Sequence, residues 1–387
     1  MYACQAICAG AGVLDDSFLL AGDRNSVDII INHHVCGNIF MLESVIHTER
    51  RALYVAEIGL NHNGDMNTAR AMISAAARAG ADAVKLQTFV PELMNSVYTA
   101  DLLEKGMELK RDTGLVDFFR KFIFDREQYR DLQSAAAEEG TIFFSSVFDI
   151  DSLNLLEGLD VPLFKLASSE ATNHALISAV ADTGKPAILS TGMASEKEIE
   201  MAVSLFRKKS GAELVLMHCV SLYPARADQV NLSRIPALAR RFGLTVGFSD
   251  HSKEAVTPML AASMGARIFE KHFTIDRFHD CPDKDISFTP EEFSGMIESV
   301  ETAVAMIGDG TISSGSAEAG TARAARRSLF ARRFIPKGKK IEKDDLAALR
   351  PGVGIPVYDL ELVAGRTAAV DINEDFLIRK EYLQNKK

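Results

Sequence analysis

The chain has 387 residues, of which 47% are hydrophobic and 25% charged, and its formal net charge is −10. Such an acidic chain lacks the broad basic surface that binds nucleic acid or anionic membrane, and no run reaches the roughly 18 apolar residues of a membrane-spanning helix. The five cysteines are an odd number without metal-ligand spacing, which is typical of a reduced, cytoplasmic protein.

The first fifty residues differ in character from the rest. They hold three of the five cysteines, show no clean helix or strand period, and lack the charged start of a signal peptide. The neighbouring His33 and His34 have no further ligand at a useful spacing, so they are weak evidence for a metal site. We interpret 1–50 as an N-terminal extension and expect the native chain to begin at Met41.

From residue 54 onward, short apolar runs rich in β-formers alternate with amphipathic helical patterns, such as those over 67–81 and 194–209. The predicted strands cover 54–59, 83–88, 141–147, 163–168, 186–192, 214–220, 245–250 and 268–274. A last helix is predicted over 290–308. Eight strand–helix units over about 250 residues predict a (β/α)₈ (TIM) barrel, with a doubly wound open sheet as the alternative. The long gap at 89–124 indicates an inserted lid or oligomer element.

Polar residues follow the predicted strands at their C-terminal ends, which is where (β/α)₈ barrels carry their chemistry. We therefore expect one site to collect the side chains of Glu57, Lys85, Gln87, Ser145, Ser146, Lys165, Ser168, Glu170, Ser190, Thr191, Ser221, Tyr223, His251 and His272. A single polar residue at a strand end is usually a loop residue in water, but eight such strand ends are hard to explain in that way.

Two groups within this set suggest chemistry. Lys85 and Lys165, with the hydroxyl groups of four serines, form a predicted cradle for a small, strongly anionic compound. The serines are Ser146, Ser168, Ser190 and Ser249. The alternative is that each lysine pairs with an acid on a neighbouring strand. Nucleotide binding is not predicted, because the chain has no Walker-type loop.

His251 and His272 follow adjacent strands, so their rings can converge on a divalent ion. Two imidazoles leave coordination positions open, as in a catalytic metal site, and Asp250 and Glu270 flank the pair. A metal there would polarise a carbonyl oxygen. The alternative is that each ring is an ordinary hydrogen-bonded core residue.

Several motifs occur in order along the barrel: AEIGLNHNGD, AVKLQTF, FKLASSE, ILSTGM, HCVSLYP, VGFSDHS, FEKHFT and CPDKDISFTPEEF. This series resembles the N-acetylneuraminate (sialic acid) synthase family from about residue 54 to the C-terminus. The tail sequence RRSLFARRFIPKGKKIEKDDLAALRPGVGIPV is similar to the antifreeze-like (SAF) domain of that family. The predicted organisation is therefore a catalytic barrel over 51–308, a linker over 309–325 and an SAF domain over 326–387.

The resemblance implies condensation of phosphoenolpyruvate with an open-chain N-acylamino sugar, giving a nine-carbon 2-keto acid and phosphate. It implies a divalent cofactor, Mn²⁺ with Mg²⁺ or Co²⁺ as alternatives, bound by His251 and His272. The residues assigned to phosphoenolpyruvate are Lys85, Ser146, Lys165, Ser168, Ser190 and Ser249. Those assigned to the sugar are Glu57, Gln87, Ser221, Tyr223, Asp283 and, in a domain-swapped homodimer, Arg350 of the partner subunit. The catalytic set is Glu57, Lys165, Glu170 and Glu270, with Glu170 orienting the attacking water.

Two departures bear on the sugar, which is N-acetylmannosamine or a 2,4-diacetamido-trideoxy hexose. Ser221 stands where sialic acid synthases often have asparagine, and NHNG at 61–64 leans toward bacterial relatives that make legionaminic acid-like sugars. Two other functions stay open. One is a Schiff-base aldolase that uses Lys165, and the other is a non-enzymatic sugar- or ice-binding protein built around the tail.

Overall fold

The computed structural model describes residues 52–97, 113–313 and 315–384. The chain divides into two compact units, the first ending at Gly308 and the second beginning at Asp309. The extension predicted over 1–50 and the start expected at Met41 lie outside the described residues.

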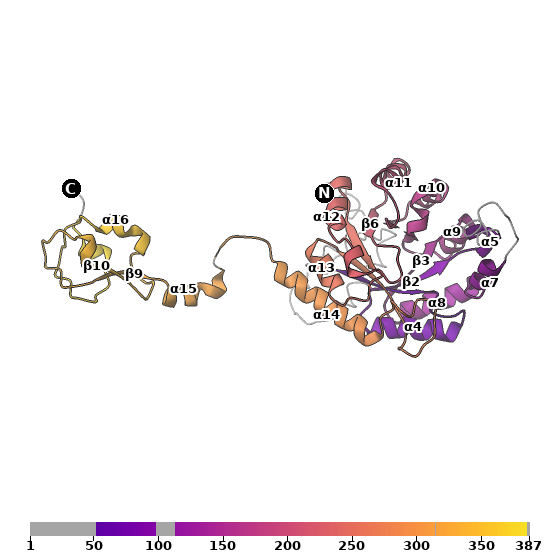
Figure 1. Cartoon of the computed structure of the whole chain (residues 1–387), viewed down its shortest axis with the longest axis horizontal. Helices are drawn as coiled ribbons and strands as arrows, with labels where there is room; N and C mark the ends of the chain where they lie inside the picture. Colours follow the sequence, from indigo (N-terminus) through magenta and orange to yellow (C-terminus); the bar gives the residue numbers. More distant parts are fainter. Residues whose placement is uncertain (1–51, 98–112, 314, 385–387) are drawn as a thin grey trace, which may run out of the picture. The chain divides into compact units, whose positions relative to one another are not determined.

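The first unit is a closed barrel of parallel strands in which each strand pairs with the next and the eighth pairs with the first (Figure 1). This confirms the predicted (β/α)₈ fold and excludes the open sheet. The strands are β1 (Leu53–Gly59), β2 (Ala83–Thr88), β3 (Ile142–Val147), β4 (Phe164–Leu166), β5 (Ala187–Ser190), β6 (Leu214–His218), β7 (Val246–Asp250) and β8 (Ile268–His272).

Helices surround the barrel, and their ends follow local capping chemistry. The outer helices are α4 (Met66–Arg78), α8 (Arg126–Glu138), α9 (Ile150–Glu157), α10 (His174–Asp182), α11 (Glu196–Lys209), α12 (Arg234–Phe242), α13 (Thr257–Ser263) and α14 (Pro290–Ile307). Helix α11 begins in a capping box between Ser195 and Glu198. Helix α12 ends at Gly243, whose φ of 60° is the left-handed conformation that glycine adopts without steric cost.

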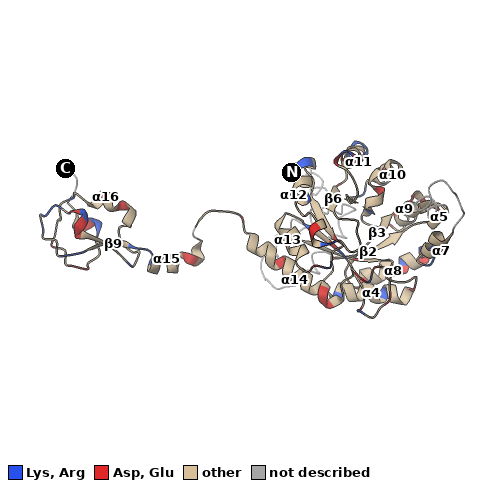
Figure 2. Ribbon diagram, viewed as in Figure 1, with Lys and Arg blue, Asp and Glu red and all other residues tan. Residues whose placement is uncertain are grey.

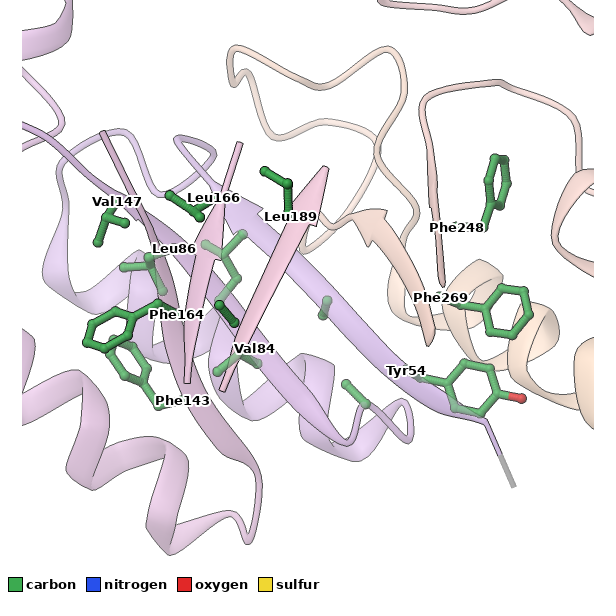
Figure 3. Packing of buried hydrophobic residues seen from close by; sticks show 14 of the residues in the cluster. Tyr54, Val84, Leu86, Phe143, Val147, Phe164, Leu166, Leu189, Phe248 and Phe269 are labelled. Atoms are coloured by element: carbon green, nitrogen blue, oxygen red, sulfur yellow. The ribbon is translucent and has the colours of Figure 1, made fainter. Parts of the chain in front are cut away.

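Successive side chains of each strand point to opposite faces of the barrel wall, and the two faces form two separate apolar cores. Outward-facing residues such as Tyr54, Val84 and Phe143 pack in the large cluster between the strands and the helices (Figure 3). Inward-facing residues fill the barrel below the strand ends: Leu53, Val55, Ala83, Phe144, Leu163, Ile188, Val215, Met217 and Ile268. These inward-facing residues form an apolar plug that closes the lower part of the barrel. The interior of the barrel is therefore open only at the C-terminal ends of the strands.

Charged residues of both signs are spread over the outer helices in the view of Figure 2. Among the described residues, no helix combines the length and apolar character that crossing a membrane requires.

The described parts of the segment predicted as an insertion over 89–124 contain two short helices, α5 (Pro91–Met94) and α7 (Gly114–Arg120). Phe89 and Phe122 from its two ends pack together with Leu60 in a small apolar cluster. The middle of the segment, 98–112, lies outside the described residues, so its role as a lid or oligomer element stays a prediction.

The second unit is built mainly from short pieces around its own apolar core, which includes Leu329, Ile341 and Ile378. Its strands β9 (Ser328–Ala331) and β10 (Leu346–Leu349) pair antiparallel, and a short helix α16 (Leu360–Val363) follows. The region predicted as a linker over 309–325 contains the helix α15 (Ala319–Ala325).

Candidate functional site

A cavity of about 350 Å³ opens at the C-terminal ends of the barrel strands. Thirteen of the predicted site residues line it: Glu57, Lys85, Gln87, Ser146, Lys165, Ser168, Ser190, Ser221, Tyr223, Ser249, His251, Glu270 and His272. The strand register explains this convergence, since Glu57 lies beside Lys85 on β2 and beside His272 on β8. Polar residues placed on different strands therefore meet above the apolar plug.

One side of the cavity holds two buried ammonium groups. Nζ of Lys85 lies 2.6 Å from Oε2 of Glu57 and donates to Oγ of Ser146 at 2.9 Å. Nζ of Lys165 donates to Oγ of Ser190 at 2.8 Å. Both arrangements that the sequence left open are present, because the lysines contact serine hydroxyl groups and also lie near carboxylates.

Glu270 lies between the two lysines, and this position determines the charge of its carboxyl group. Its carboxylate oxygens are 3.9 Å from Nζ of Lys85 and 3.8 Å from Nζ of Lys165, and one accepts a hydrogen bond from Ser249 at 3.0 Å. Burial alone would raise the pKa of Glu270, but Lys165 and Lys85 lower it to about 2. Glu270 is therefore ionised at neutral pH and balances the lysine charges.

The pKa values of the other charged groups on this side of the cavity shift in different directions. Burial would lower the pKa of Lys85, but Glu270 and Glu57 raise it. Burial lowers the pKa of Lys165, and Glu270 opposes that effect only in part. Burial raises the pKa of Glu57, with Lys85 opposing. Glu57 is thus the carboxyl group of the cavity that takes up a proton more readily than usual.

The opposite side of the cavity holds the two histidines, whose ring centroids are 5.5 Å apart. Nδ1 of His251 lies 2.7 Å from the carbonyl oxygen of Val220, so Nδ1 carries the hydrogen and Nε2 carries the lone pair. Oγ of Ser249 lies 3.4 Å from this Nε2. Tyr223 stacks on His251 with 4.3 Å between centroids. Burial, with His272 as the next cause, lowers the pKa of His251 to about 3, so this ring is neutral at pH 7.

His272 has a carboxylate behind it. Its Nδ1 lies 3.2 Å from Oδ2 of Asp283. Burial would lower the pKa of His272, but Asp283 raises it. A carbonyl behind one imidazole and a carboxylate behind the other are the outer partners that metal-binding histidines usually have. These two rings fit a transition metal as a partial ligand set, although the described residues hold no group of three His, Cys, Asp or Glu side chains arranged as ligands.

Four predicted residues of the first unit do not line the cavity. Oγ of Ser145 lies 2.7 Å from Oγ1 of Thr88, and Oγ1 of Thr191 donates to the carbonyl oxygen of Met217 at 3.1 Å. Glu170 and Asp283 also lie outside the cavity. Both carboxylate oxygens of Glu170 are engaged beside it, accepting from Ser169 and from Asn173. Asp283 stands behind His272 rather than in the lining. Arg350 belongs to the second unit. The water-orienting role that the resemblance implies for Glu170 would require its carboxylate to leave these hydrogen bonds.

Five lining residues were not predicted: Phe148, Ala167, Ser169, Met193 and Cys219. Sγ of Cys219 is 3.0 Å from Oγ of Ser168, which also accepts from the backbone N–H of Gly192 at 3.1 Å. A Cβ atom at Gly192 would lie 2.5–2.9 Å from side-chain atoms of Ser168, Cys219 and Ser221, so only glycine lets these groups gather. The cysteine within HCVSLYP was the available signal, but a small buried thiol is usually a core residue.

Asn61, the first residue of the NHNG motif, has a role that the sequence did not predict. Its side-chain amide donates to the carbonyl oxygen of Phe273 at 2.9 Å and to Oγ of Ser287 at 2.8 Å, and its Oδ1 accepts from the backbone N–H of Asp283 at 3.0 Å. The buried amide uses its hydrogen-bonding groups to hold the loop after β8 against the loop after β1. Asn61 therefore fixes the position from which Asp283 approaches His272.

Residues 72–312 match the family model described as the NeuB family, and residues 326–384 match the SAF domain. The chain is 34% identical to N,N'-diacetyllegionaminic acid synthase of Legionella pneumophila, over 85% of this chain and 94% of that protein. It is 32% identical to a pseudaminic acid synthase of Campylobacter jejuni, over 84% of this chain and 95% of that protein. The crystal structure of N-acetylneuraminic acid (sialic acid) synthetase from Leptospira borgpetersenii is similar, with 35% identity and a TM-score of 0.63, covering 70% of this chain and 90% of that one.

Proposed function

The chain belongs to the NeuB family, and on that premise we propose that it is a sialic acid-type (nonulosonate) synthase. The proposed reaction condenses phosphoenolpyruvate with an open-chain N-acylamino sugar and yields a nine-carbon 2-keto acid and phosphate. The proposed sugars are N-acetylmannosamine and the 2,4-diacetamido-trideoxy hexoses. The relatives are named as enzymes that make legionaminic, pseudaminic and sialic acids, and these names support this class of product.

One observation carries the proposal. Two buried ammonium groups with serine partners occupy one side of the cavity, and two imidazoles occupy the other. Ammonium and hydroxyl donors suit the phosphate and carboxylate of phosphoenolpyruvate. The imidazole side suits a sugar aldehyde that must be polarised before carbon attacks it. A cavity that holds both the ammonium groups and the imidazoles supports a reaction that joins an anionic enol to an aldehyde.

The bond changes balance as follows. C3 of phosphoenolpyruvate bonds to the aldehyde carbon, whose oxygen takes a proton, and positive charge develops at C2. Water adds to C2 and loses a proton, which gives a tetrahedral intermediate with a C2 hydroxyl group. That hydroxyl group loses its proton and becomes the 2-keto oxygen as the C2–O bond breaks, and phosphate leaves with the electron pair of that bond. Lys85 and Lys165 stabilise the departing phosphate through charge-assisted hydrogen bonds. Glu57, whose pKa burial raises, is suited to exchange a proton within the cavity.

A divalent metal ion, proposed as Mn²⁺ with Mg²⁺ or Co²⁺ as alternatives, would be held by His251 and His272. Neutral imidazole nitrogen favours transition metals over Ca²⁺, and the low pKa of His251 keeps that ring in the neutral form that binds metal. When bound, such an ion supplies Lewis-acid polarisation of a carbonyl oxygen. Asp283 and the carbonyl of Val220 orient the two rings from behind.

A Schiff-base aldolase is the second candidate, and one observation favours it. Burial lowers the pKa of Lys165, which makes its amine more nucleophilic. The test is reduction with borohydride in the presence of pyruvate. A covalent adduct on Lys165 would support the aldolase, and the synthase proposal expects no adduct.

The same resemblance supports a proposal for the second unit, which matches the SAF domain. We propose that Arg350 of a second copy contacts the N-acyl group of the sugar in a domain-swapped homodimer. Mixing Arg350→Ala and His272→Ala chains tests this idea, because mixed dimers would contain one site that lacks neither side chain. Random mixing predicts recovery toward about a quarter of wild-type activity, and no recovery would contradict the swap.

The direct experiment is a panel of N-acylamino hexoses, each incubated with phosphoenolpyruvate and Mn²⁺ and followed by phosphate release. The proposal predicts sugar-dependent release with at least one member of the panel. A His272→Ala protein, purified in the same way, serves as the control for phosphate released by contaminants. No turnover with any sugar would contradict the synthase function.

A further inference from the structure

A buried ammonium group lies on the outer face of the two strands that precede the histidines. Lys271 comes directly before His272 on β8, and its side chain is 0% exposed. Because successive residues of a strand face opposite sides, His272 faces the cavity and Lys271 faces the helices. Its Nζ lies 4.3 Å from the ring centroid of Phe288, a member of the outer apolar cluster. Lys271 therefore takes no direct part in the cavity.

Its polar contacts bracket His251. Nζ of Lys271 donates to Oδ2 of Asp250 at 3.1 Å and to the carbonyl oxygen of Ser252 at 2.5 Å. Oδ1 of Asp250 accepts from the backbone N–H of Ser252 at 2.8 Å. One ammonium group thus connects the residues before and after His251 to the residue before His272.

The strand ladder does not reach His251. The pairing of β7 with β8 ends at Asp250 opposite Lys271, so His251 lies one residue past the last paired position. Backbone pairing between these strands consequently does not fix the distance from His251 to His272. The contacts of Lys271 with Asp250 and Ser252 extend the connection between the two strands to the residues on either side of His251.

Energetics favour a geometric role over a stabilising one. Burying an ammonium group and a carboxylate carries a large desolvation cost for each ion, and their attraction often does no more than offset that cost. Here the pair is satisfied by a backbone carbonyl and a backbone N–H that both belong to Ser252. The hydrogen-bonded pair therefore fixes the backbone on either side of a cavity histidine.

We propose that Lys271, acting with Asp250, is a positioning residue that sets the spacing of the His251 and His272 rings for a divalent cation. The inference rests on the proposed metal-dependent function and adds to it a buried ion pair outside the cavity. Its effect is on metal affinity, because outer partners of metal-binding residues typically change that affinity 10- to 100-fold.

The test measures Mn²⁺ binding to chelator-stripped protein without substrates, from the electron paramagnetic resonance signal of free Mn²⁺. Asp250→Asn is the mild variant, and Asp250→Asn combined with Lys271→Gln removes both charges while keeping hydrogen-bonding groups. The matched control is Lys253→Gln, a neighbouring lysine whose side chain is 53% exposed. We expect the Kd for Mn²⁺ to rise about 10- to 100-fold in both Asp250 variants and to change less than about twofold in the control.

The melting temperature of each protein is measured alongside. Folded Asp250 variants that bind Mn²⁺ with the wild-type Kd would overturn the positioning role while leaving the proposed function intact. If neither variant folds, the pair is a stability element and the inference is also overturned. Absence of Mn²⁺ binding by the wild-type protein would instead overturn the proposed metal site itself.

Discussion

The backbone N–H of Asp283 donates to Oδ1 of Asn61 across 3.0 Å, so a residue after the first barrel strand fixes a residue after the last. The two positions are 222 residues apart in the sequence. Asp283 in turn lies 3.2 Å from His272, which places Asn61 two contacts away from the imidazole side of the cavity. Closure of the barrel between β1 and β8 brings these residues together.

Asn61→Ala is expected to weaken sugar binding more than phosphoenolpyruvate binding. The change leaves buried polar groups of the loop after β8 without partners, at a cost of about 1–3 kcal/mol, and releases Asp283. We predict that the KM of the sugar rises about tenfold, as about 1.4 kcal/mol implies. Asn63→Ala is the control, since Asn63 contacts the same loop through the carbonyl of Asp280 at an exposed site. Equal changes in both KM values would contradict this role.

Lys165→Ala is expected to raise the KM of phosphoenolpyruvate while changing that of the sugar much less. Hydrogen bonds to charged groups contribute about 1.5–3 kcal/mol, which predicts an increase of roughly 10- to 100-fold. Lys185→Ala is the matched control, because Lys185 pairs with Asp160 on the outside of the barrel. Steady-state kinetics with each substrate varied in turn make the comparison, and a larger effect on the sugar would argue against the anion cradle.

Chelation is expected to abolish activity, and Mn²⁺ should restore it better than Ca²⁺ because imidazole ligands favour transition metals. His251→Ala and His272→Ala should each lose this rescue. His174→Ala, which changes an exposed histidine at the start of α10, should keep it. Activity is measured after chelator treatment and again after titration with each metal. Rescue that survives in both cavity variants would rule out the two-histidine site.

We expect the free energy of unfolding to fall in mild acid, because two histidines are buried in their neutral form. Burial lowers the pKa of both His62 and His218 to about 4. Between about pH 6.5 and pH 4 the unfolded chain binds protons at these rings and the folded chain does not, so protonation favours unfolding. Lowering the pH from 7 to 5.5 should cost about 1.2 kcal/mol for each ring.

The measurement is denaturant unfolding of the wild type and of His218→Gln at both pH values. The wild type should lose about 1.2 kcal/mol more than the variant, which has no titrating ring at this position. An identical loss in the two proteins would show that His218 does not contribute.

The strand bounds show what a local pattern can predict. The run predicted over 163–168 forms a strand only over Phe164–Leu166, and a 3₁₀ helix begins at Ser168. The apolar run itself gives no sign of where pairing with distant strands ends. Most of the cavity was predictable, because polar residues at the ends of barrel strands must converge. Asn61 and Lys271 were not, since an asparagine in a loop and a lysine on a strand acquire their roles only from contacts that the closed barrel creates.

The most direct test of the proposed chemistry follows the labelled carbon of [2-¹³C]phosphoenolpyruvate by nuclear magnetic resonance, with the sugar that releases phosphate in the panel. The account predicts that the enol carbon signal is replaced by the C2 signal of a nine-carbon sugar acid, in step with phosphate release. Label that stays in phosphoenolpyruvate, or appears only as pyruvate while the sugar is unchanged, would contradict condensation in the cavity of Lys85, Lys165, His251 and His272.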